Sequence, residues 1–224
     1  PISINLDLTA ACNFACPHCV DSGIINTGEA LSLENIKASL KTLTDHGLKS
    51  VILIGGGEPT LHPNFAEILT YAKELRLQVG LVTNGSRLHK VLPLAHLFEE
   101  RDWVRLSIDA ATEDTFFAAH RQASGVTLEG ILANAKALKA ANPKIQLGYS
   151  FVVVWDGIEM GGRELTANVS EMAGAVKLAR AHGFDYISFK PCLVRLEGSG
   201  REALFNGTVT DEERRIVDAV SQNL

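Results

Sequence analysis

Three cysteines near the N-terminus, Cys12, Cys16 and Cys19, follow the spacing C-x3-C-x2-C. Three thiolates this close together can bind three corners of a four-iron cube and leave the fourth iron without a protein ligand. An iron with a vacant position can bind and activate a small molecule, whereas a fully ligated cluster mainly carries electrons. The spacing therefore predicts a metal cluster that takes part in chemistry.

A structural zinc site is the alternative interpretation of this loop, with His18 as the fourth ligand. Zinc favours four protein ligands in a closed site. His18 lies between Pro17 and Cys19, where it is too cramped to ligate a metal beside the cysteines without strain. With Cys192 as the one further cysteine, the chain has too few for a disulfide scaffold, and the clustered thiols favour a reducing, cytoplasmic compartment.

A second candidate motif is the run Gly-Gly-Gly-Glu-Pro at residues 55–59. Consecutive glycines let the backbone approach a ligand closely, because no Cβ atom intervenes. The carboxylate of Glu58 can accept hydrogen bonds from an ammonium group. By itself, the run is also consistent with a flexible turn between a strand and a helix.

The elements that must position these motifs alternate between strands and helices. We expect strands over residues 3–9, 49–54, 78–82, 104–108, 145–154 and 186–189. We expect helices between the capping residue Ser32 and the terminating Gly47, and over residues 65–72, 92–99, 128–140, 168–183 and 211–220. Six such units predict a parallel α/β sheet with right-handed crossovers, too few for a closed eight-stranded barrel. An open, partial barrel or a doubly wound sheet remains, with the chemistry at the carboxyl ends of the strands.

Three local expectations complete this outline. Asn168 and Glu171 have the spacing of a capping box for the helix that follows them. Residues 155–167 are expected to form a loop over the carboxyl ends of the strands. His120 is expected on the surface of a helix, with no part in the chemistry.

One face of several predicted strands is polar. Strand parity groups Asn5 with Asp7 and Thr9, Arg105 with Ser107 and Asp109, and Tyr186 with Ser188 and Lys190. Helices should cover the apolar faces, so the polar faces would line a roomy interior that holds water or a ligand. The alternative is that some of these strands are sheet edges with one solvated face.

Composition argues against several classes of function. The 224 residues are 46% hydrophobic and 21% charged, which is ordinary for a globular protein, and the net charge is −5. There is no basic run to favour nucleic-acid binding, and no run of about 18 apolar residues to span a membrane. The chain begins at Pro1 with neither an initiator methionine nor a signal peptide, so we expect a fragment or a trimmed form.

Together, the cysteine loop after the first strand and the glycine-rich run after the second resemble the radical S-adenosylmethionine (radical SAM) enzymes. Further matches follow in order along the chain, at Thr83-Asn84-Gly85, Ser107-Ile108-Asp109, Arg121 and Ser150. The resemblance covers the whole chain. It implies a single core domain over residues 1–224, built as a partial (β/α)6 TIM-like barrel of parallel strands that is open on one side.

By this resemblance, the three cysteines would bind a [4Fe–4S] cluster, and the amino and carboxylate groups of S-adenosylmethionine (SAM) would complete the fourth iron. The residues implied at SAM are Gly56, Gly57 and Glu58 at the amino group, Ser107 and Asp109 at the ribose or methionyl part, Arg121 at the carboxylate, His18 near the adenine, and also Thr83, Asn84 and Ser150. The family usually has an aromatic residue where this chain has His18. An electron donor such as flavodoxin or ferredoxin is the implied partner.

The implied reaction is reductive cleavage of SAM to a 5′-deoxyadenosyl radical, which removes a hydrogen atom from a small organic substrate. Cys192 and Lys190 follow the sixth strand and are the candidate residues on the substrate side. Cys192 has three interpretations: a buried small hydrophobe, a hydrogen donor to the substrate radical, or a ligand of an auxiliary cluster. Lys190 either holds a phosphate or carboxylate of the substrate or extends into solvent.

Epimerisation, or another redox-neutral change of a small natural-product precursor such as a sugar, is the favoured reaction. It rests on Cys192 as a hydrogen donor and on the lack of a second cysteine cluster in this sequence. A peptide- or protein-modifying maturase is the second candidate, and it would need a cysteine-rich C-terminal extension that this chain lacks. A non-catalytic iron–sulfur or zinc-binding module is the alternative of another class, and it predicts no cleavage of SAM.

Overall fold

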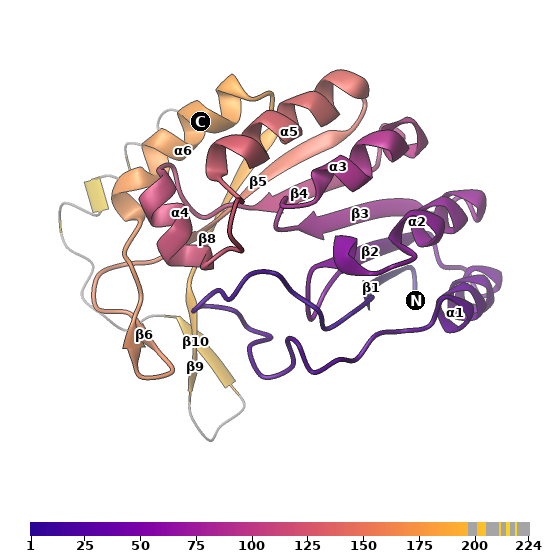
Figure 1. Cartoon of the computed structure of the whole chain (residues 1–224), viewed down its shortest axis with the longest axis horizontal. Helices are drawn as coiled ribbons and strands as arrows, with labels where there is room; N and C mark the ends of the chain where they lie inside the picture. The colour runs from indigo at the N-terminus through magenta and orange to yellow at the C-terminus, as the bar shows by residue number, and fades with distance from the viewer. Residues whose placement is uncertain (197–200, 205–210, 212–213, 216–217, 219–224) are drawn as a thin grey trace.

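The computed structural model describes residues 1–196, 201–204, 211, 214, 215 and 218 (Figure 1). Six parallel strands form its main sheet in the order β1-β2-β3-β4-β5-β8. They are β1 (Ser3–Asp7), β2 (Ser50–Ile54), β3 (Gln78–Thr83), β4 (Trp103–Ser107), β5 (Gln146–Val153) and β8 (Tyr186–Pro191). Within the described residues β1 and β8 do not pair, so the sheet is open on one side. The strand order never reverses, as it would in a doubly wound sheet, and this confirms the predicted α/β open barrel.

Helices connect the strands and cover the outer face of the sheet (Figure 1). They are α1 (Leu33–Asp45), α2 (Phe65–Glu74), α3 (Leu88–Val91), α4 (Glu113–His120), α5 (Leu128–Ala141) and α6 (Met172–Ala181). The core lies between sheet and helices, where Leu53 and Leu81 from the strands are buried with Ile36 and Leu40 from α1. In the described part of the chain, no helix has the length and apolar character needed to cross a membrane.

The local signals for these elements are largely confirmed. Each predicted strand ends within two residues of the observed one. Ser32 Oγ accepts a hydrogen bond from Asn35 N at 3.2 Å and so caps α1. Gly47 follows this helix with φ +98°, a conformation that residues with a Cβ atom rarely adopt.

Helix α4 is absent from the predicted elements, because its eight residues carry only a weak apolar stripe. Thr112 Oγ1 caps it by accepting from Thr115 N. The surface position predicted for His120 is wrong, since this residue is 2% exposed. It lies one turn after the buried Phe116, on the helix face that packs against the cysteine loop.

The capping role predicted for Asn168 and Glu171 is also wrong. The Asn168 side chain makes no cap hydrogen bond. Its amide oxygen instead accepts from Val154 N, and its amide nitrogen donates to Asp109 O and Val152 O, all at 2.8 Å. Buried backbone groups at the end of β5 need hydrogen-bond partners. The Asn168 side chain, which the sequence pattern assigned to the helix cap, supplies them instead.

Two small hairpins stand beside the sheet. The predicted loop over residues 155–167 contains β6 (Glu159–Met160) paired with β7 (Arg163–Glu164), and β9 (Leu193–Leu196) pairs with β10 (Arg201–Leu204). Most of the last predicted helix, residues 211–220, lies outside the described residues, and the four residues described there are helical.

The register of the strands brings polar residues together on the inner face of the sheet. One row across β4, β5 and β8 consists of Ser107, Ser150 and Ser188. In the next row Arg105 pairs with Gly148, and Gly148 with Tyr186. A Cβ atom at Gly148 would lie 2.4 Å from the Tyr186 hydroxyl, so the tyrosine ring lies over this glycine. The central strands therefore line a polar interior, while Asn5 and Asp7 are exposed on the edge strand β1.

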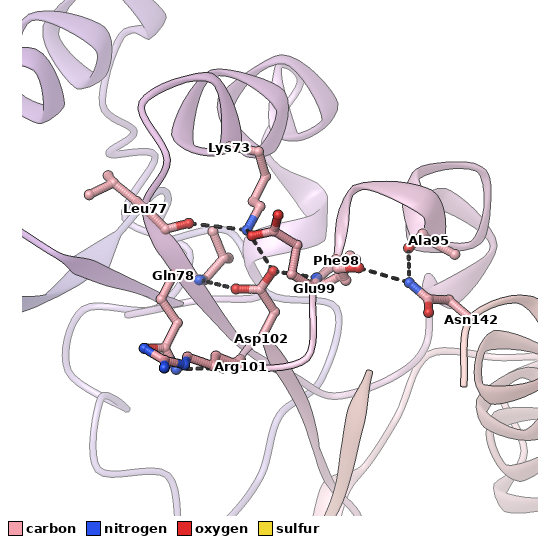
Figure 2. A network of polar contacts seen from close by, with 10 residues as sticks. Lys73, Leu77, Gln78, Ala95, Phe98, Glu99, Arg101, Asp102 and Asn142 are labelled. Carbon is pink, nitrogen blue, oxygen red and sulfur yellow. Dashed lines mark hydrogen bonds and ion pairs between the residues drawn. The ribbon is translucent and has the colours of Figure 1, made fainter. Parts of the chain in front are cut away.

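A polar network around Asp102 joins the amino ends of β3 and β4 (Figure 2). The buried Asp102 carboxylate accepts hydrogen bonds from Val79 N at 2.6 Å, Glu99 N at 2.8 Å and Lys73 Nζ at 2.7 Å. Asn142 ties the end of α5 to the same side of the molecule through two backbone carbonyls. This end of a barrel usually serves stability, and the opposite end chemistry.

Candidate functional site

A cavity of about 280 Å³ lies at the carboxyl ends of β2 to β5, beside the loop that follows β1. Its lining includes the three clustered cysteines and most of the predicted cofactor residues. These are Cys12, Cys16, Cys19, His18, Gly56, Gly57, Glu58, Thr83, Asn84, Ser107, Asp109 and Ser150. Apolar side chains such as Phe14 and Val152 complete the wall. Segments far apart in the sequence thus meet at the end of the barrel where the chemistry was expected.

The cysteines lie on the long indigo segment between β1 and α1 (Figure 1). Asn26 N donates to Ala10 O at 2.7 Å, and the Asn26 side chain accepts from Cys12 N at 2.9 Å. Phe14 is buried and packs edge-on against Phe116 of α4, with 6.1 Å between ring centroids. The loop is therefore fixed to the barrel by contacts of its own.

Burial raises the pKa of the Cys12 and Cys16 thiols above their ordinary values. Repulsion between acidic groups adds to the effect, from Glu58 on Cys12 and from Cys19 on Cys16. A positively charged metal centre relieves this repulsion, because metals bind the thiolate form.

The orientation of His18 argues against the zinc alternative, which needs this residue as the fourth ligand. His18 Nε2 lies 3.4 Å from Asp109 Oδ2 and is thus directed at a carboxylate.

The glycine-rich run packs directly against the cysteine loop. Gly57 N donates to Thr9 O at 2.9 Å, and Glu58 N donates to Ala11 O at 2.8 Å. A Cβ atom at Gly57 would lie 2.1 Å from Ala11 O, so this approach requires glycine. The contact fixes the position of Glu58 relative to the cysteines.

The Glu58 carboxylate is buried at the cavity wall and held by its own chain. Oε1 accepts hydrogen bonds from the hydroxyls of Thr60 at 2.5 Å and Thr83 at 2.7 Å, and Oε2 accepts from Asn84 N at 2.7 Å. Burial raises the pKa of this carboxyl, and the hydrogen bonds oppose the rise. Thr83 and Asn84 therefore orient Glu58, in addition to lining the cavity.

Asn84 also connects the end of β3 to the cysteine loop. Its Nδ2 donates to Asn13 Oδ1 at 3.0 Å, and Asn13 Nδ2 donates to Ser86 Oγ at 3.0 Å. The sequence prediction gave Asn13 no part in the site. Its position between two of the cysteines was the available signal.

Asp109 connects β4, β5 and the cysteine loop. Its φ is +55°, a left-handed conformation that aspartate tolerates better than most residues. Oδ1 accepts from Val152 N at 2.6 Å, and Oδ2 lies 3.5 Å from His120 Nε2. Burial alone would raise the pKa of Asp109, but the hydrogen bond from His18 brings it below its ordinary value.

His120 lies directly behind the cysteine loop, although the sequence prediction gave it no role. Burial lowers the pKa of its imidazole. Nε2 donates to Ile108 O at 2.8 Å, since a carbonyl can only accept, and Nδ1 lies 3.2 Å from Cys16 Sγ. Ala15 N also donates to His120 O at 3.0 Å. Thr112 and the acidic residues after it signal the start of α4 in the sequence, but not this contact.

Two predicted residues lie near this cavity without lining it. Arg121 is exposed at the end of α4 and lines a neighbouring cavity that Cys16 and Cys19 also touch. Lys190 is exposed on the inner face of β8, in register with Val152. Their roles toward cofactor and substrate stay predictions.

Cys192 is 2% exposed and lies apart from the cavity. It packs in a small apolar cluster with Val154, Ile158 and Leu165. Burial also raises the pKa of its thiol. Of the three interpretations, this position favours the buried small hydrophobe.

Comparison with known proteins adds independent findings. The family model described as the radical SAM superfamily matches residues 6–169. An S-adenosylmethionine-dependent nucleotide dehydratase of Selenomonas ruminantium is 33% identical over 117 residues, which cover 51% of this chain and 42% of the relative. The mycofactocin maturase MftC of Mycobacterium ulcerans is 32% identical over 148 residues, which cover 66% of this chain and 40% of the relative. The matched region therefore spans less than half of either relative.

Solved structures share the fold at low sequence identity. Streptococcus suis SuiB bound to the precursor peptide SuiA has a TM-score of 0.71 and 17% identity, with 100% of this chain and 46% of that chain covered. A radical SAM methyltransferase from Sphaerobacter thermophilus has a TM-score of 0.67 and 12% identity, with 98% and 63% covered. At such identities the likeness shows the fold alone.

Proposed function

Because the chain belongs to the radical SAM superfamily, we propose that it is the catalytic core of an enzyme that removes a hydrogen atom from an organic substrate held in the open barrel. Membership brings two cofactors, a [4Fe–4S] cluster and SAM, which together supply a one-electron reduction and the 5′-deoxyadenosyl radical that takes the hydrogen atom. An external electron donor such as flavodoxin or ferredoxin belongs to this proposal.

The observation that carries the proposal is the meeting of the cysteine loop and Glu58 at one cavity. Three thiols line this wall, and Cys192 lies in a separate apolar cluster. Such a donor set fits a cluster with one iron left for a non-protein ligand.

The neighbouring residues are suited to hold SAM. Glu58 presents a carboxylate to an amino group, and Gly56 and Gly57 allow close approach of the backbone. His18 and Asp109 form a hydrogen-bonded pair on the same wall, with His18 able to stack near an adenine. Apolar side chains such as Phe14 and Ile54 reduce the access of water to this wall.

The test is anaerobic reconstitution of the full chain with iron and sulfide, followed by reduction and measurement of 5′-deoxyadenosine formed from SAM. We expect the wild type to form it, and Cys16→Ala to lose both iron and activity. A reduced, cluster-loaded protein that never forms 5′-deoxyadenosine would contradict the proposal and support the non-catalytic module.

For the reaction itself we propose two candidates. The first is a redox-neutral change of a small precursor with Cys192 as hydrogen donor. The apolar surroundings of Cys192 do not support this donor role. Cys192→Ala tests it, since an unchanged product spectrum rejects the donor.

The second candidate is a peptide- or protein-modifying maturase, which the similarity to mycofactocin maturases favours. This candidate places further clusters outside the matched region, which spans 40% of one such relative and 37% of another. Iron analysis of the protein purified from its native source tests this. More than about four irons per chain supports auxiliary clusters, and about four argues against them.

A further inference from the structure

Two cations on the inner face of the barrel, Arg105 and Lys190, form no ion pair within the described residues. Arg105 lies on β4, two residues before Ser107 of the cavity wall, and Lys190 lies on β8. Their register partners Val82 and Val152 both line the cavity. Arg105 also pairs with Gly148 of β5, and Lys190 lies beside Val152, four residues further along β5 and nearer the carboxyl ends of the strands.

Arg105 is half-buried, and a buried charged group without hydrogen-bond partners costs free energy of folding. Its Nε is buried without a hydrogen-bond partner in the described structure. The guanidinium lies 5.4 Å from the Trp103 ring centroid, a contact that leaves its N–H groups available. By contrast, the largely buried cation Lys73, on α2 at the amino end of the barrel, is paired with Asp102 and Glu99 (Figure 2).

Lys190 faces the same interior as Arg105, because strand parity places it on the face of β8 that carries Ser188, in one row with Ser107 of β4. Burial lowers the pKa of the Lys190 ammonium, and repulsion from Arg105 lowers it further, while Asp109 acts in the opposite direction. Tyr186 adds a hydroxyl to the same surface, because its ring crosses Gly148 toward β4. Two like charges and a hydroxyl donor thus share a surface that has no carboxylate in contact with either cation among the described residues.

We propose that Arg105 and Lys190 bind an oxyanion of the substrate, a phosphate or a carboxylate, at the edge of the cavity. The guanidinium fork matches two oxygens of such a group, and the ammonium adds a point charge. The inference deepens the proposed function, on which it rests, by naming the substrate as an anion. Anchored there, the substrate would reach from β4 and β8 toward the cavity wall that carries the cysteines.

Isothermal titration of the full chain, without cluster or SAM, tests the site with pyrophosphate, inorganic phosphate and succinate as probes. We expect one class of probe to bind, and Arg105→Gln and Lys190→Gln each to weaken that binding at least about tenfold. Lys136→Gln removes an equal charge from the exposed face of α5 and should bind as the wild type does. Binding of phosphates or of succinate identifies which oxyanion the site prefers.

Three results would overturn the site: no binding of any probe by the wild type, unchanged binding in both variants, or equal weakening by Lys136→Gln. Lys190 is exposed, so its variant keeps the test decisive if Arg105→Gln does not fold. Because the titration uses no cofactor, a negative result contradicts the oxyanion site but not SAM cleavage by the wild type. Likewise, a failure of the wild type to cleave SAM contradicts the proposed function but not the binding of an oxyanion.

Discussion

Glu58 accepts four hydrogen bonds from its own chain, so its carboxylate is oriented before any ligand binds. Two come from the hydroxyls of Thr60 and Thr83, and two from backbone N–H groups. A hydroxyl can turn and accept instead, whereas the N–H of Asn84 can only donate. The hydrogen-bond donors around this position therefore require the carboxylate oxygens of glutamate, in addition to its charge.

Glu58→Gln should weaken SAM binding at least about tenfold, because the neutral amide loses its attraction for an ammonium group. Equilibrium dialysis measures this. Glu67→Gln, on the exposed face of α2, is the matched control and should bind SAM normally. The iron content of reconstituted Glu58→Gln should equal that of the wild type. A lower iron content in this variant would show that Glu58 mainly supports the cysteine loop.

His120→Phe keeps an aromatic ring beside Phe116 but removes the donor to Ile108 O. A buried carbonyl without a partner should lower the free energy of unfolding by about 1–3 kcal/mol, measured in urea. Phe117→Ala, at a 60% exposed position of the same helix, should change it by no more than about 0.5 kcal/mol. Wild-type stability in His120→Phe would argue against this contact.

At the residue scale, the predictable part of the site is the part encoded in short spacings. Cys12, Cys16 and Cys19 share one loop, and Glu58 ends a glycine run, so local sequence marked them. His120 was missed because it meets Cys16 only after β4 and α4 fold back over the loop. No spacing between residues this far apart encodes the contact.

At the element scale, Glu171 joins the start of α6 to the start of α4. Its carboxylate accepts from the hydroxyls of Thr112 at 2.5 Å and Thr115 at 2.6 Å, and from the N–H groups of Ala111 and Thr112. Burial alone would raise the pKa of Glu171, but these hydrogen bonds bring it below its ordinary value. The ionised carboxylate therefore stabilises the fold.

Glu171→Gln should lower the free energy of unfolding by about 1–3 kcal/mol at pH 7. The folded pKa lies below the unfolded value of about 4.3, so the stabilisation is complete above that pH and is lost as the pH falls through the folded pKa. The difference in urea midpoint from the wild type should hold from about pH 7 to 5 and shrink below about pH 4. Glu74→Gln, exposed on α2, should show no such change. An undiminished difference at pH 3 would contradict this role.

For the whole molecule, alternating strand and helix segments predicted the open barrel, because parallel neighbours need crossover connections on one side. The hairpin β6–β7 has two residues in each strand, too few to show periodicity. Its flanks supply Ile158 and Leu165, which bury Cys192. The surroundings of Cys192 were thus unpredictable although its position at the end of a strand was correct.

The amino end of the barrel carries contacts that stabilise the fold, and the carboxyl end carries the cavity. Asp102 and Lys73 pair at the amino end, and neither lines the cavity at the carboxyl end (Figure 2). The Lys73 side chain is 10% exposed, so the pair is largely withdrawn from water. Removing one partner of such a pair costs more than removing an exposed one.

Asp102→Asn should therefore lower the free energy of unfolding by about 3 kcal/mol, because Lys73 keeps only the exposed Glu99 as an ionic partner, beside the Leu77 carbonyl. Asp45→Asn, which breaks an exposed pair with Lys41, should cost no more than about 1 kcal/mol. Urea unfolding measures both. The folded fraction of Asp102→Asn should bind SAM with wild-type affinity in equilibrium dialysis, since the network is remote from the cavity. Weaker binding in this variant, with Asp45→Asn unaffected, would show instead that the two ends of the barrel are coupled.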